Sequence, residues 1–475
     1  MRLVRSRVEV LSPAEIRRIH CASLNVLWEV GVQLPNEWLL ARLRALGASV
    51  EGDVVHLPGA LVERMLEEIG ERPRGRHACA VNRGQVRVTN GNETLLLDYP
   101  SRTRRPGTLE DVLKGIVLTN ALPTVAHALP VVVPADVPLP LAPIECYRLG
   151  CLYSRKPFGV YFGPAAAETL MDMAEVLAEA RGLDRAASGF GFSFGVISPL
   201  RFGAEDLDCA LRVAARGWPA SCYSFVVVGA TAPASMAGAL VLSNAERLAC
   251  LTLMWLWGAP GYREGHVDDP AMIEPRTLAS SFGHPNLTTL AIATAQLSRF
   301  YGLRGGGALA LSDAKDVDFQ SGLERGLGAV FAVLAGGGIG NSGIVGADEA
   351  LSLEQLVLDD AALSMLNWIT RGIEVTDETL ALDVIQAVGI GGDYLGQPHT
   401  ARHLRREYWE SPLFIRRAWA DWERGGAETL LERAHAEVER ILAAGYPPQP
   451  VLDAEAAARL EAIVERARAT NALRR

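Results

Sequence analysis

Residues 305–324 read GGGALALSDAKDVDFQSGLE, and this stretch contains the unit from which we expect the fold to be built. Its first seven residues, GGGALAL, form a short apolar run with the length of a buried strand. A polar segment rich in aspartate follows, and a helical pattern begins near Phe319. A strand, a loop and a helix in this order predict one βα unit of a parallel sheet.

The same alternation extends on both sides of this unit. Six further apolar runs occupy Thr124–Val133, Phe158–Gly163, Gly189–Val196, Ser221–Gly229, Gly258–Tyr262 and Gly337–Val345. Helical patterns lie between the runs, at 165–180, 204–216, 235–257, 287–301 and 319–334. An eighth strand is expected near Leu95–Tyr99 or after residue 360. Eight βα units predict an α/β protein with a closed TIM (β/α)8 barrel. An open doubly wound sheet is the alternative, and it would usually carry a nucleotide-binding fingerprint.

Helical patterns also occupy both ends of the chain. Ser12-Pro13-Ala14-Glu15 has the N-cap, first-position proline and acidic first turn of a helix start. We therefore expect a helical N-terminal extension over 1–90, the barrel over 91–395, and a helical extension over 396–475 packed on the barrel. The last helix, Asp453–Ala469, is rich in Ala, Glu and Arg and is expected to be a solvated surface helix.

Composition and charge exclude several classes of protein. The 475 residues are 49% hydrophobic and 21% charged, as in ordinary globular proteins. The 46 basic and 55 acidic residues give a net charge of −9, which argues against a nucleic-acid partner. The most apolar segment, Ala121–Leu141, contains five prolines and is better explained as a strand and a loop than as a membrane span. We expect a cytoplasmic protein without a membrane anchor.

The cysteines and one histidine pair give no metal or disulfide signature. The seven cysteines are dispersed, odd in number and without a CxxC pair, which favours a reducing compartment and inert core thiols. His399 and His403 fall on one helical face, but the sequence offers no third ligand, so no metal site is predicted. His399 remains a candidate for a polar contact to substrate at the barrel mouth.

The richest candidate site is the segment after the 305–311 strand. Barrel enzymes keep their catalytic groups at the carboxyl ends of the strands, where this segment is expected to lie. Gln320 and Glu324 are four residues apart, hence on one helical face. An acidic N-cap and first turn explain Asp313, Asp316 and Asp318 well, but they explain Gln320 and Glu324 less well. Tyr223 and Tyr262 near predicted strand ends favour a pocket for a cation, because aromatic faces bind quaternary ammonium groups.

Several segments in order resemble the trimethylamine methyltransferase family of corrinoid-dependent enzymes. The residues that carry the resemblance are VLWEVGVQLPNEWLLARLRALGASV (26–50), Arg105-Pro106-Gly107-Thr108, GATAPASMAGALVLSNAERLA (229–249), SDAKDVDFQSGLE (312–324), SLEQLVLDD (352–360), GIEVTDETLALDVIQAVGIGGDYLGQPHTARHLRREYW (372–409) and RRAWADWERGG (416–426). The resemblance runs over nearly the whole chain.

The resemblance implies a TIM barrel that moves a methyl group from a methylated amine to the cobalt of a corrinoid (cobalamin) on a separate partner protein. The chain is written without pyrrolysine, and relatives of that kind demethylate quaternary amines such as glycine betaine. A quaternary nitrogen leaves as a neutral amine, so its displacement needs no special activator. On this interpretation Asp313, Gln320 and Glu324 are the catalytic candidates, and Tyr223, Tyr262 and His399 contact the substrate. Family members are often oligomeric, and a homo-oligomer with Trp409, Trp419 and Trp422 at its interface is one reading of that tryptophan-rich region.

One departure from the family pattern leaves alternatives open. Relatives usually have Gly-Ser-Pro-Glu where this chain has Gly283-His284-Pro285-Asn286. Asn286 in place of the glutamate implies a different substrate or the loss of methyl transfer. Two alternatives therefore stand: a barrel hydrolase or lyase that uses Asp313 and Glu324 as acid and base, and a non-catalytic relative that binds a quaternary amine.

Overall fold

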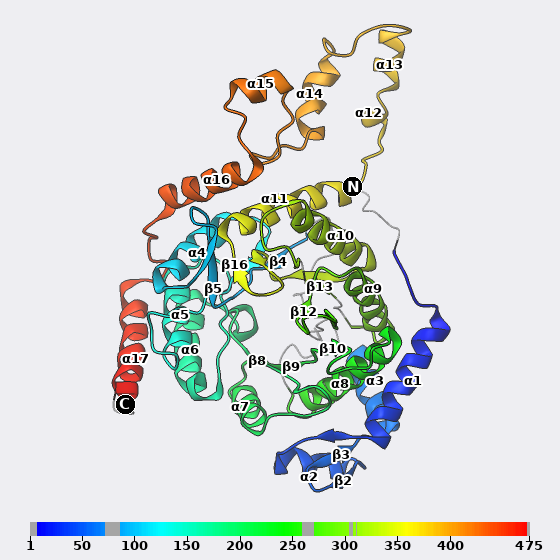
Figure 1. The fold of residues 1–475 in the computed structure, drawn as a ribbon, viewed down its shortest axis with the longest axis vertical. Helices are drawn as coiled ribbons and strands as arrows, with labels where there is room; N and C mark the ends of the chain where they lie inside the picture. The colour runs from blue at the N-terminus through cyan, green and yellow to red at the C-terminus, as the bar shows by residue number, and fades with distance from the viewer. Residues whose placement is uncertain (1–6, 72–85, 259–269, 304–306, 310, 473–475) are drawn as a thin grey trace.

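The computed structural model describes residues 7–71, 86–258, 270–303, 307–309 and 311–472, and its body consists of short strands enclosed by helices (Figure 1). The strands are mostly parallel. Paired neighbours are β4 (Val88–Thr89) with β7 (Val125–His127), β8 (Phe192–Gly195) with β9 (Ala220–Tyr223), β10 (Val227–Val228) with β11 (Ala271–Ile273), and β13 (Gly307–Leu309) with β14 (Gly338–Gly340).

Two isolated parallel bridges connect these pairs further. Ala128, just after β7, bridges to Phe158, and Asn90, just after β4, bridges to Ser342, just after β14. The second bridge makes neighbours of strands about 250 residues apart in the chain. Because each of these pairs is parallel, its two strands end on the same side, and we call the side at which the strands end the carboxyl edge.

The helices that surround the strands follow the predicted alternation. They are α4 (Leu109–Ala121), α5 (Ala142–Tyr153), α6 (Ala167–Arg181), α7 (Ala204–Ala215), α8 (Met236–Leu256), α9 (Pro285–Phe300), α10 (Phe319–Ala335) and α11 (Leu353–Thr370). Side-chain caps fix several starts: Ser235 accepts from the Gly238 N–H before α8, and Asp318 accepts from the Ser321 N–H before α10. The predicted alternation of strands and helices, and hence the mixed α/β class, is confirmed.

Two strand predictions need comment. Leu95–Tyr99 contains a strand, β5 (Leu95–Asp98), but it pairs antiparallel with β6 (Thr103–Pro106) in a hairpin. The strand that pairs with β7 is β4 and not the predicted one. β4 lies inside the predicted N-terminal extension, and it is too short and too polar to be recognised as an apolar run. In the predicted run Gly258–Tyr262, residues 259–262 lie outside the described residues.

The N-terminal region packs helices and a small sheet on the body. α1 (Pro13–Glu29) begins with a capping box of Ser12 and Glu15, as the motif predicts. α2 (Glu37–Ala45) and α3 (Gly59–Glu71) follow, but so does an antiparallel sheet of β1 (Val32–Gln33), β2 (Ser49–Glu51) and β3 (Val54–His56), so this region is not purely helical.

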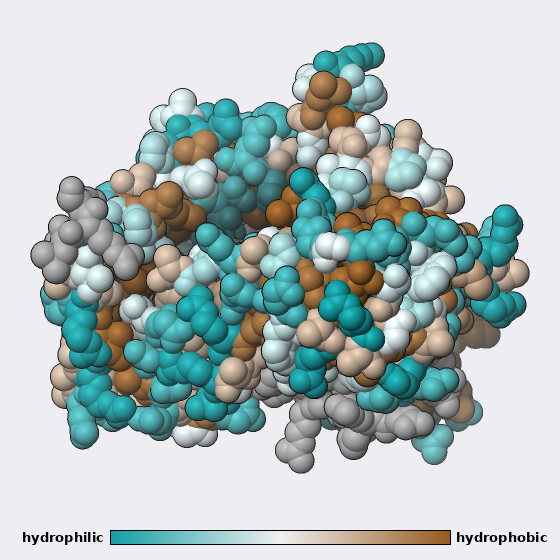
Figure 2. Space-filling view, turned by 90° about the horizontal axis from the view of Figure 1, so that it is seen from below, coloured by the Kyte–Doolittle hydropathy of each residue, from teal (hydrophilic) through white to brown (hydrophobic). Residues whose placement is uncertain are grey.

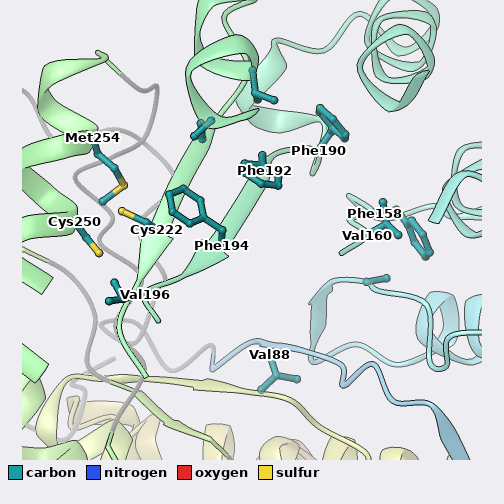
Figure 3. Packing of buried hydrophobic residues seen from close by; sticks show 14 of the residues in the cluster. Val88, Phe158, Val160, Phe190, Phe192, Phe194, Val196, Cys222, Cys250 and Met254 are labelled. Carbon is teal, nitrogen blue, oxygen red and sulfur yellow. The ribbon is translucent and has the colours of Figure 1, made fainter. Parts of the chain in front are cut away.

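One hydrophobic core connects these parts. Its buried residues run from Ile16 in α1 to Val464 in α17 (Ala454–Ala472). Figure 3 shows its centre, where aromatic side chains of β8 lie near Cys222 and Met254. Leu460 and Val464 are fully buried, and α17 packs on α5 and α6. The last helix therefore has one buried face and is not only a solvated surface helix.

A segment after α11 projects from the body in Figure 1 and returns at α16 (Leu430–Gly445). It contains α12 (Asp377–Leu380), α13 (Leu382–Val388), α14 (Pro398–Glu407) and α15 (Trp419–Arg424). Among the described residues, α8 alone has the length and hydropathy of a membrane span, and 78% of its most apolar window is buried inside the protein. The face drawn in Figure 2 carries hydrophilic residues interrupted by separate hydrophobic areas.

Candidate active site at the carboxyl edge

Asp313 and Glu324 lie close together after β13, because the Glu324 carboxylate accepts a hydrogen bond from the Asp313 backbone N–H. Asp313 accepts from the Phe282 N–H at 2.8 Å and from the Ser281 hydroxyl, on β12 (Ser280–Ser281). Glu324, in the first turns of α10, accepts from the Ser312 hydroxyl at 2.6 Å and from the Asp313 N–H at 2.9 Å. Every partner described for the two carboxylates is a donor, so together they present negative charge at this edge.

Gln320 and Gly283 complete the surroundings of Glu324. The Gln320 side chain donates to Glu324 Oε1 at 2.9 Å, as expected from their four-residue spacing on α10. Gly283 leaves the space in which the carboxylate lies, because a Cβ at this position would be 2.1 Å from Glu324 Oε2 and 2.9 Å from the Asp313 nitrogen. The predicted catalytic trio therefore lies together, and a glycine is required beside it.

A second pair of carboxyl groups lies next to the first. Glu93 follows β4 and faces Asp348, whose φ of +67° places it in the left-handed region. Burial, followed by the charge and the hydrogen bond of Asp348, raises the pKa of Glu93 to about 9, so this carboxyl holds a proton at neutral pH. The loop of Asp348 is bonded to the Asp313 loop, since the Ala347 N–H donates to the Ser312 carbonyl at 2.9 Å.

The segment whose backbone binds Asp313 also carries one of two stacked aromatic rings. Phe282, whose N–H binds Asp313, stacks on Phe225 with ring centroids 6.0 Å apart and an interplanar angle of 22°. Both rings belong to a small apolar cluster with Leu311 and Ile344, separate from the main core. The combination of negative charge and aromatic faces is the chemistry by which proteins bind quaternary ammonium ions.

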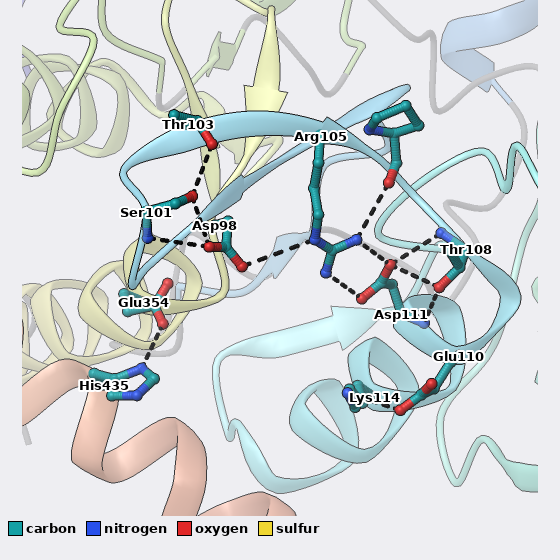
Figure 4. A network of polar contacts seen from close by, with 11 residues as sticks. Asp98, Ser101, Thr103, Arg105, Thr108, Glu110, Asp111, Lys114, Glu354 and His435 are labelled. Atoms are coloured by element: carbon teal, nitrogen blue, oxygen red, sulfur yellow. Dashed lines mark hydrogen bonds and ion pairs between the residues drawn. The ribbon is translucent and has the colours of Figure 1, made fainter.

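The β5–β6 hairpin contacts both the loops of this site and the start of α4. Figure 4 shows the polar contacts at its base. At its base, Arg105 makes a bidentate ion pair with Asp111 at 2.7 and 2.8 Å. At its outer end, Arg102 pairs with Asp316, and Arg104 pairs with Glu349 at 2.7 Å. These last two partners lie in the loops that carry Asp313 and Asp348, so the hairpin holds both loops.

A pocket of about 250 Å³ opens at the carboxyl ends of the neighbouring strands. It is mainly apolar and is lined in part by Asn92, Val132, Cys146, Val160 and Tyr161. Asp313 and Glu324 do not line it. The carboxylates have the more specific chemistry, so we take them as the candidate site and the pocket as an apolar neighbour on the same edge.

Of the remaining predicted residues, Tyr223 lies at the carboxyl end of its strand and His399 lies elsewhere. Tyr223 ends β9, and a Cβ on Gly195 would be 3.2 Å from its ring. Tyr262 lies outside the described residues. His399 begins α14 in the projecting segment, away from the strands (Figure 1), so one copy of the chain does not bring it to Asp313. The rings of His399 and His403 stack with centroids 4.2 Å apart.

Sequence reasoning missed Glu93, Phe282 and Ser281. Glu93 is separated from Asp313 by 220 positions and lies just past the predicted boundary at residue 90, so nothing local connects them. The signal that was present is Gly283: an unexplained glycine next to a predicted strand end indicates close approach of another group, here Glu324.

Comparison with known proteins identifies the family. The family described as trimethylamine methyltransferase (MTTB) matches residues 2–472. A glycine betaine methyltransferase of Desulfitobacterium hafniense (strain Y51) is 30% identical over 472 residues, covering 96% of this chain and 97% of that protein. A trimethylamine methyltransferase MttB of Methanosarcina thermophila is 33% identical over 247 residues, covering 52% of this chain and 50% of that protein.

Comparison with solved structures shows proteins of similar fold. The monomethylamine methyltransferase MtmB of Methanosarcina barkeri is similar at a TM-score of 0.50 with 10% identity, over 92% of this chain and 89% of that one. A hydroxylamine complex of MtmB gives a TM-score of 0.51 with the same identity and coverage. With the family match extending over almost every residue, the chain belongs to the trimethylamine methyltransferase (MTTB) family, a family of methyltransferases.

Proposed function

We propose that this protein transfers a methyl group from a small, betaine-like quaternary amine to the cobalt of a corrinoid carried by a separate protein. The observation that carries the proposal is the pairing of two carboxylates with two stacked phenylalanine rings at the carboxyl edge. The end-to-end similarity to a glycine betaine methyltransferase supports the same substrate class.

The side chains bind and orient the cation. Asp313 and Glu324 compensate its positive charge, and Phe225 and Phe282 offer aromatic faces to its methyl groups. Gln320, Ser312 and the two backbone N–H groups hold the carboxylates in place. A quaternary nitrogen leaves as a neutral amine, so positioning and exclusion of water are the main tasks of the chain.

The corrinoid requires a wide, apolar approach to this edge. Tyr161 is 55% exposed and Phe319 is 82% exposed, and each follows a strand whose carboxyl end lies here. Such a rim fits a flat macrocycle presented by a partner protein. When bound, the corrinoid cobalt supplies the nucleophile that accepts the methyl group.

We also propose that the parallel strands close into a (β/α)8 barrel. The bridge from Asn90 to Ser342 supports closure, because it joins the first and last of the parallel strands. In this proposal the N-terminal extension ends before β4 at Val88 and the barrel ends with α11 at Thr370, so that the projecting segment belongs with the C-terminal extension. We place the protein in the cytoplasm, where its dispersed free thiols are stable.

The hydrolase or lyase alternative requires one of the two carboxyl groups to donate a proton. Among the described contacts, Asp313 accepts from the Phe282 N–H, and Glu324 accepts from the Asp313 N–H and from the Gln320 amide. This arrangement favours a binding role for the pair over an acid–base role.

The test is methyl transfer to a reduced corrinoid protein, followed by the absorbance change from Co(I) to methyl-Co(III). We expect methylation with at least one quaternary amine from a panel of betaines and none with trimethylamine. A glycine betaine methyltransferase with its own corrinoid protein serves as the positive control. Absence of methylation with every quaternary amine, while that control is active, contradicts the proposal.

Glu324→Gln tests the site within the same assay. The amide places an N–H₂ group among the three donors that surround Glu324 and removes its charge, so we expect kcat/KM to fall by about 10²-fold or more. Glu349→Gln makes the same chemical change in an exposed side chain at the same edge, where its partners are Arg104 and Lys315. We expect this control to stay within about 2-fold of the parent.

A further inference from the structure

A second pocket lies at the amino ends of β4 and β7, at the other end of these strands from the carboxyl edge. The Val88 N–H donates to the Thr124 carbonyl at 2.9 Å, which holds the two strand starts side by side. The pocket has a volume of about 180 Å³, and it shares no residue with the site proposed for methyl transfer. It is lined by Val86, Arg87, Pro123, Thr124, Ser364 and Asn367.

Lys156 lies beside this pocket. Its ammonium group donates to the Leu122 carbonyl, and the next two residues of the chain, Pro123 and Thr124, line the pocket. Lys156 follows α5 and is half-buried. Asp360 of α11 is fixed at the same strand start, because its carboxylate accepts from the Thr124 N–H at 2.8 Å and from the Thr124 hydroxyl at 2.6 Å. The pocket therefore has an amine and a carboxylate at its border.

Lys156 differs from the other two lysines of the chain, Lys114 and Lys315. Lys114 pairs with Glu110 at 2.8 Å, and Lys315 pairs with Glu349 at 3.7 Å. Among the described contacts, the Lys156 ammonium binds a carbonyl oxygen and has no carboxylate within ion-pair distance. A close carboxylate holds a lysine in its charged form, and Lys156 lacks one.

The surroundings of Lys156 favour its uncharged amine. Burial lowers the pKa of Lys156 from 10.5 to about 8; the charge of Asp360 opposes this shift, and the charge of Arg87 adds to it. At pH 7 about a tenth of the Lys156 amines are then uncharged, and an uncharged amine is a nucleophile. The hydrogen bond from Lys114 to Glu110 has the opposite effect and raises the pKa of Lys114.

Arg87 gives the pocket a group that binds anions. It is exposed, lines the pocket and has no ion pair among the described residues. A guanidinium group binds phosphate oxygens through two parallel hydrogen bonds. A cavity of about 150 Å³ holds a molecule as large as benzene, so this pocket has room for a small acyl phosphate. With its phosphate against Arg87, such a molecule has its acyl group in the pocket that Lys156 borders.

We propose that Lys156 is a site of covalent acylation by small acyl phosphates, which the pocket binds through Arg87. The Lys156 nitrogen forms a bond with the acyl carbon, and the bond from that carbon to the phosphate oxygen breaks with its electron pair on the oxygen. The proton of the amine passes to the departing phosphate, so the products are an amide and hydrogen phosphate. The modification removes the positive charge of Lys156. It is independent of the proposed methyl transfer, because it uses no residue of the carboxyl edge.

The test is the rate of acetylation of each lysine in the full-length protein incubated with acetyl phosphate at pH 7.5. Cleavage at arginine places the three lysines on different peptides, so mass spectrometry follows them in one sample. We expect Lys156 to react at least about 10-fold faster than Lys114 and Lys315. Its rate should level off above about pH 8, where its amine is mostly uncharged. A rate at Lys156 no higher than at the other two lysines overturns the proposal.

Arg87→Met separates phosphate binding from general reactivity. We expect it to slow acetylation of Lys156 by acetyl phosphate by about 10-fold, and acetylation by the uncharged donor p-nitrophenyl acetate by less than about 3-fold. Arg155→Met is the matched control, because Arg155 is exposed and adjacent to Lys156 in the chain but does not line the pocket. It is expected to keep the parent's rates. Equal losses with both donors in Arg87→Met, or equal losses in the two variants, overturn the role of Arg87.

Discussion

The position of the Glu324 carboxylate depends on residue 283 having no side chain. We expect Gly283→Ala to displace the Glu324 carboxylate, because the new Cβ would lie 2.1 Å from Oε2, with the Asp313 backbone nitrogen 2.9 Å away. Methyl transfer should then fall about as far as in Glu324→Gln, roughly 10²-fold, as measured by the cobalt absorbance change.

Gly322→Ala is the matched control for that change. Gly322 lies in α10, and a Cβ there meets nothing within 4 Å. The substitution should leave activity unchanged and stabilise the helix by about 0.5–1 kcal/mol in urea unfolding. Full activity in Gly283→Ala would show that Glu324 does not need this position.

Glu93 makes the stability of the protein depend on pH in an unusual direction. Its pKa is raised from 4.5 to about 9, so between these values the folded chain keeps a proton that the unfolded chain releases. The stabilisation of the folded chain by this proton is complete below pH 4.5 and is lost as the pH rises towards 9. Solvent screens part of the pair, so we expect the free energy of unfolding to fall by about 2 kcal/mol over this range.

Glu93→Gln keeps the neutral shape and removes the titration. Urea unfolding of both proteins at pH 5, 7 and 9 should show the parent losing stability relative to the variant as the pH rises. Asp348→Asn should shift the parent's dependence to lower pH, because the charge of Asp348 helps to raise the pKa of Glu93. Parallel pH profiles for the parent and Glu93→Gln contradict the assignment.

At the scale of elements, the β5–β6 hairpin is fixed at its base by Arg105 and Asp111. Although burial alone would raise it, hydrogen bonds from Arg105 and Thr108 hold the pKa of Asp111 below its ordinary value. We expect Arg105→Met to cost about 2 kcal/mol at pH 7, because it leaves a buried carboxylate without its cation. The loss should shrink as the pH falls, because uptake of a proton removes the charge of Asp111.

Arg104→Met on the same hairpin is the control. Arg104 pairs with Glu349, and both side chains are about half exposed. Its replacement should cost about 0.5 kcal/mol or less in chemical unfolding. Equal losses for the two variants would mean that the hairpin base contributes no more than a surface ion pair.

At the scale of the whole molecule, the two ends of the chain share one core. Leu460 in α17 is fully buried against the body. We expect Leu460→Ala to destabilise the protein by about 3 kcal/mol, and Arg466→Ala on the exposed face of α17 to change it by less than about 0.5 kcal/mol. We expect thermal unfolding to give one transition at the same temperature by tryptophan fluorescence and by circular dichroism. A separate transition at lower temperature in Leu460→Ala would show that α17 unfolds independently.

The sequence by itself determined the alternation of strands and helices and the trio Asp313, Gln320 and Glu324. Helix bounds follow from local caps and apolar spacing, and a four-residue spacing fixes one face of one helix, so both can be read from neighbouring residues. Only the tertiary structure decided which distant groups join that trio. Pairing of β4 with β7 and its bridge to the chain after β14 bring Glu93 to Asp348, and the packing of Phe282 on Phe225 adds the aromatic wall. These contacts depend on strand order and on the twist of the sheet, which local spacing does not encode. His399 lies in the projecting segment after α11 for the same reason. No short-range pattern in the sequence shows that the chain leaves the body after Thr370.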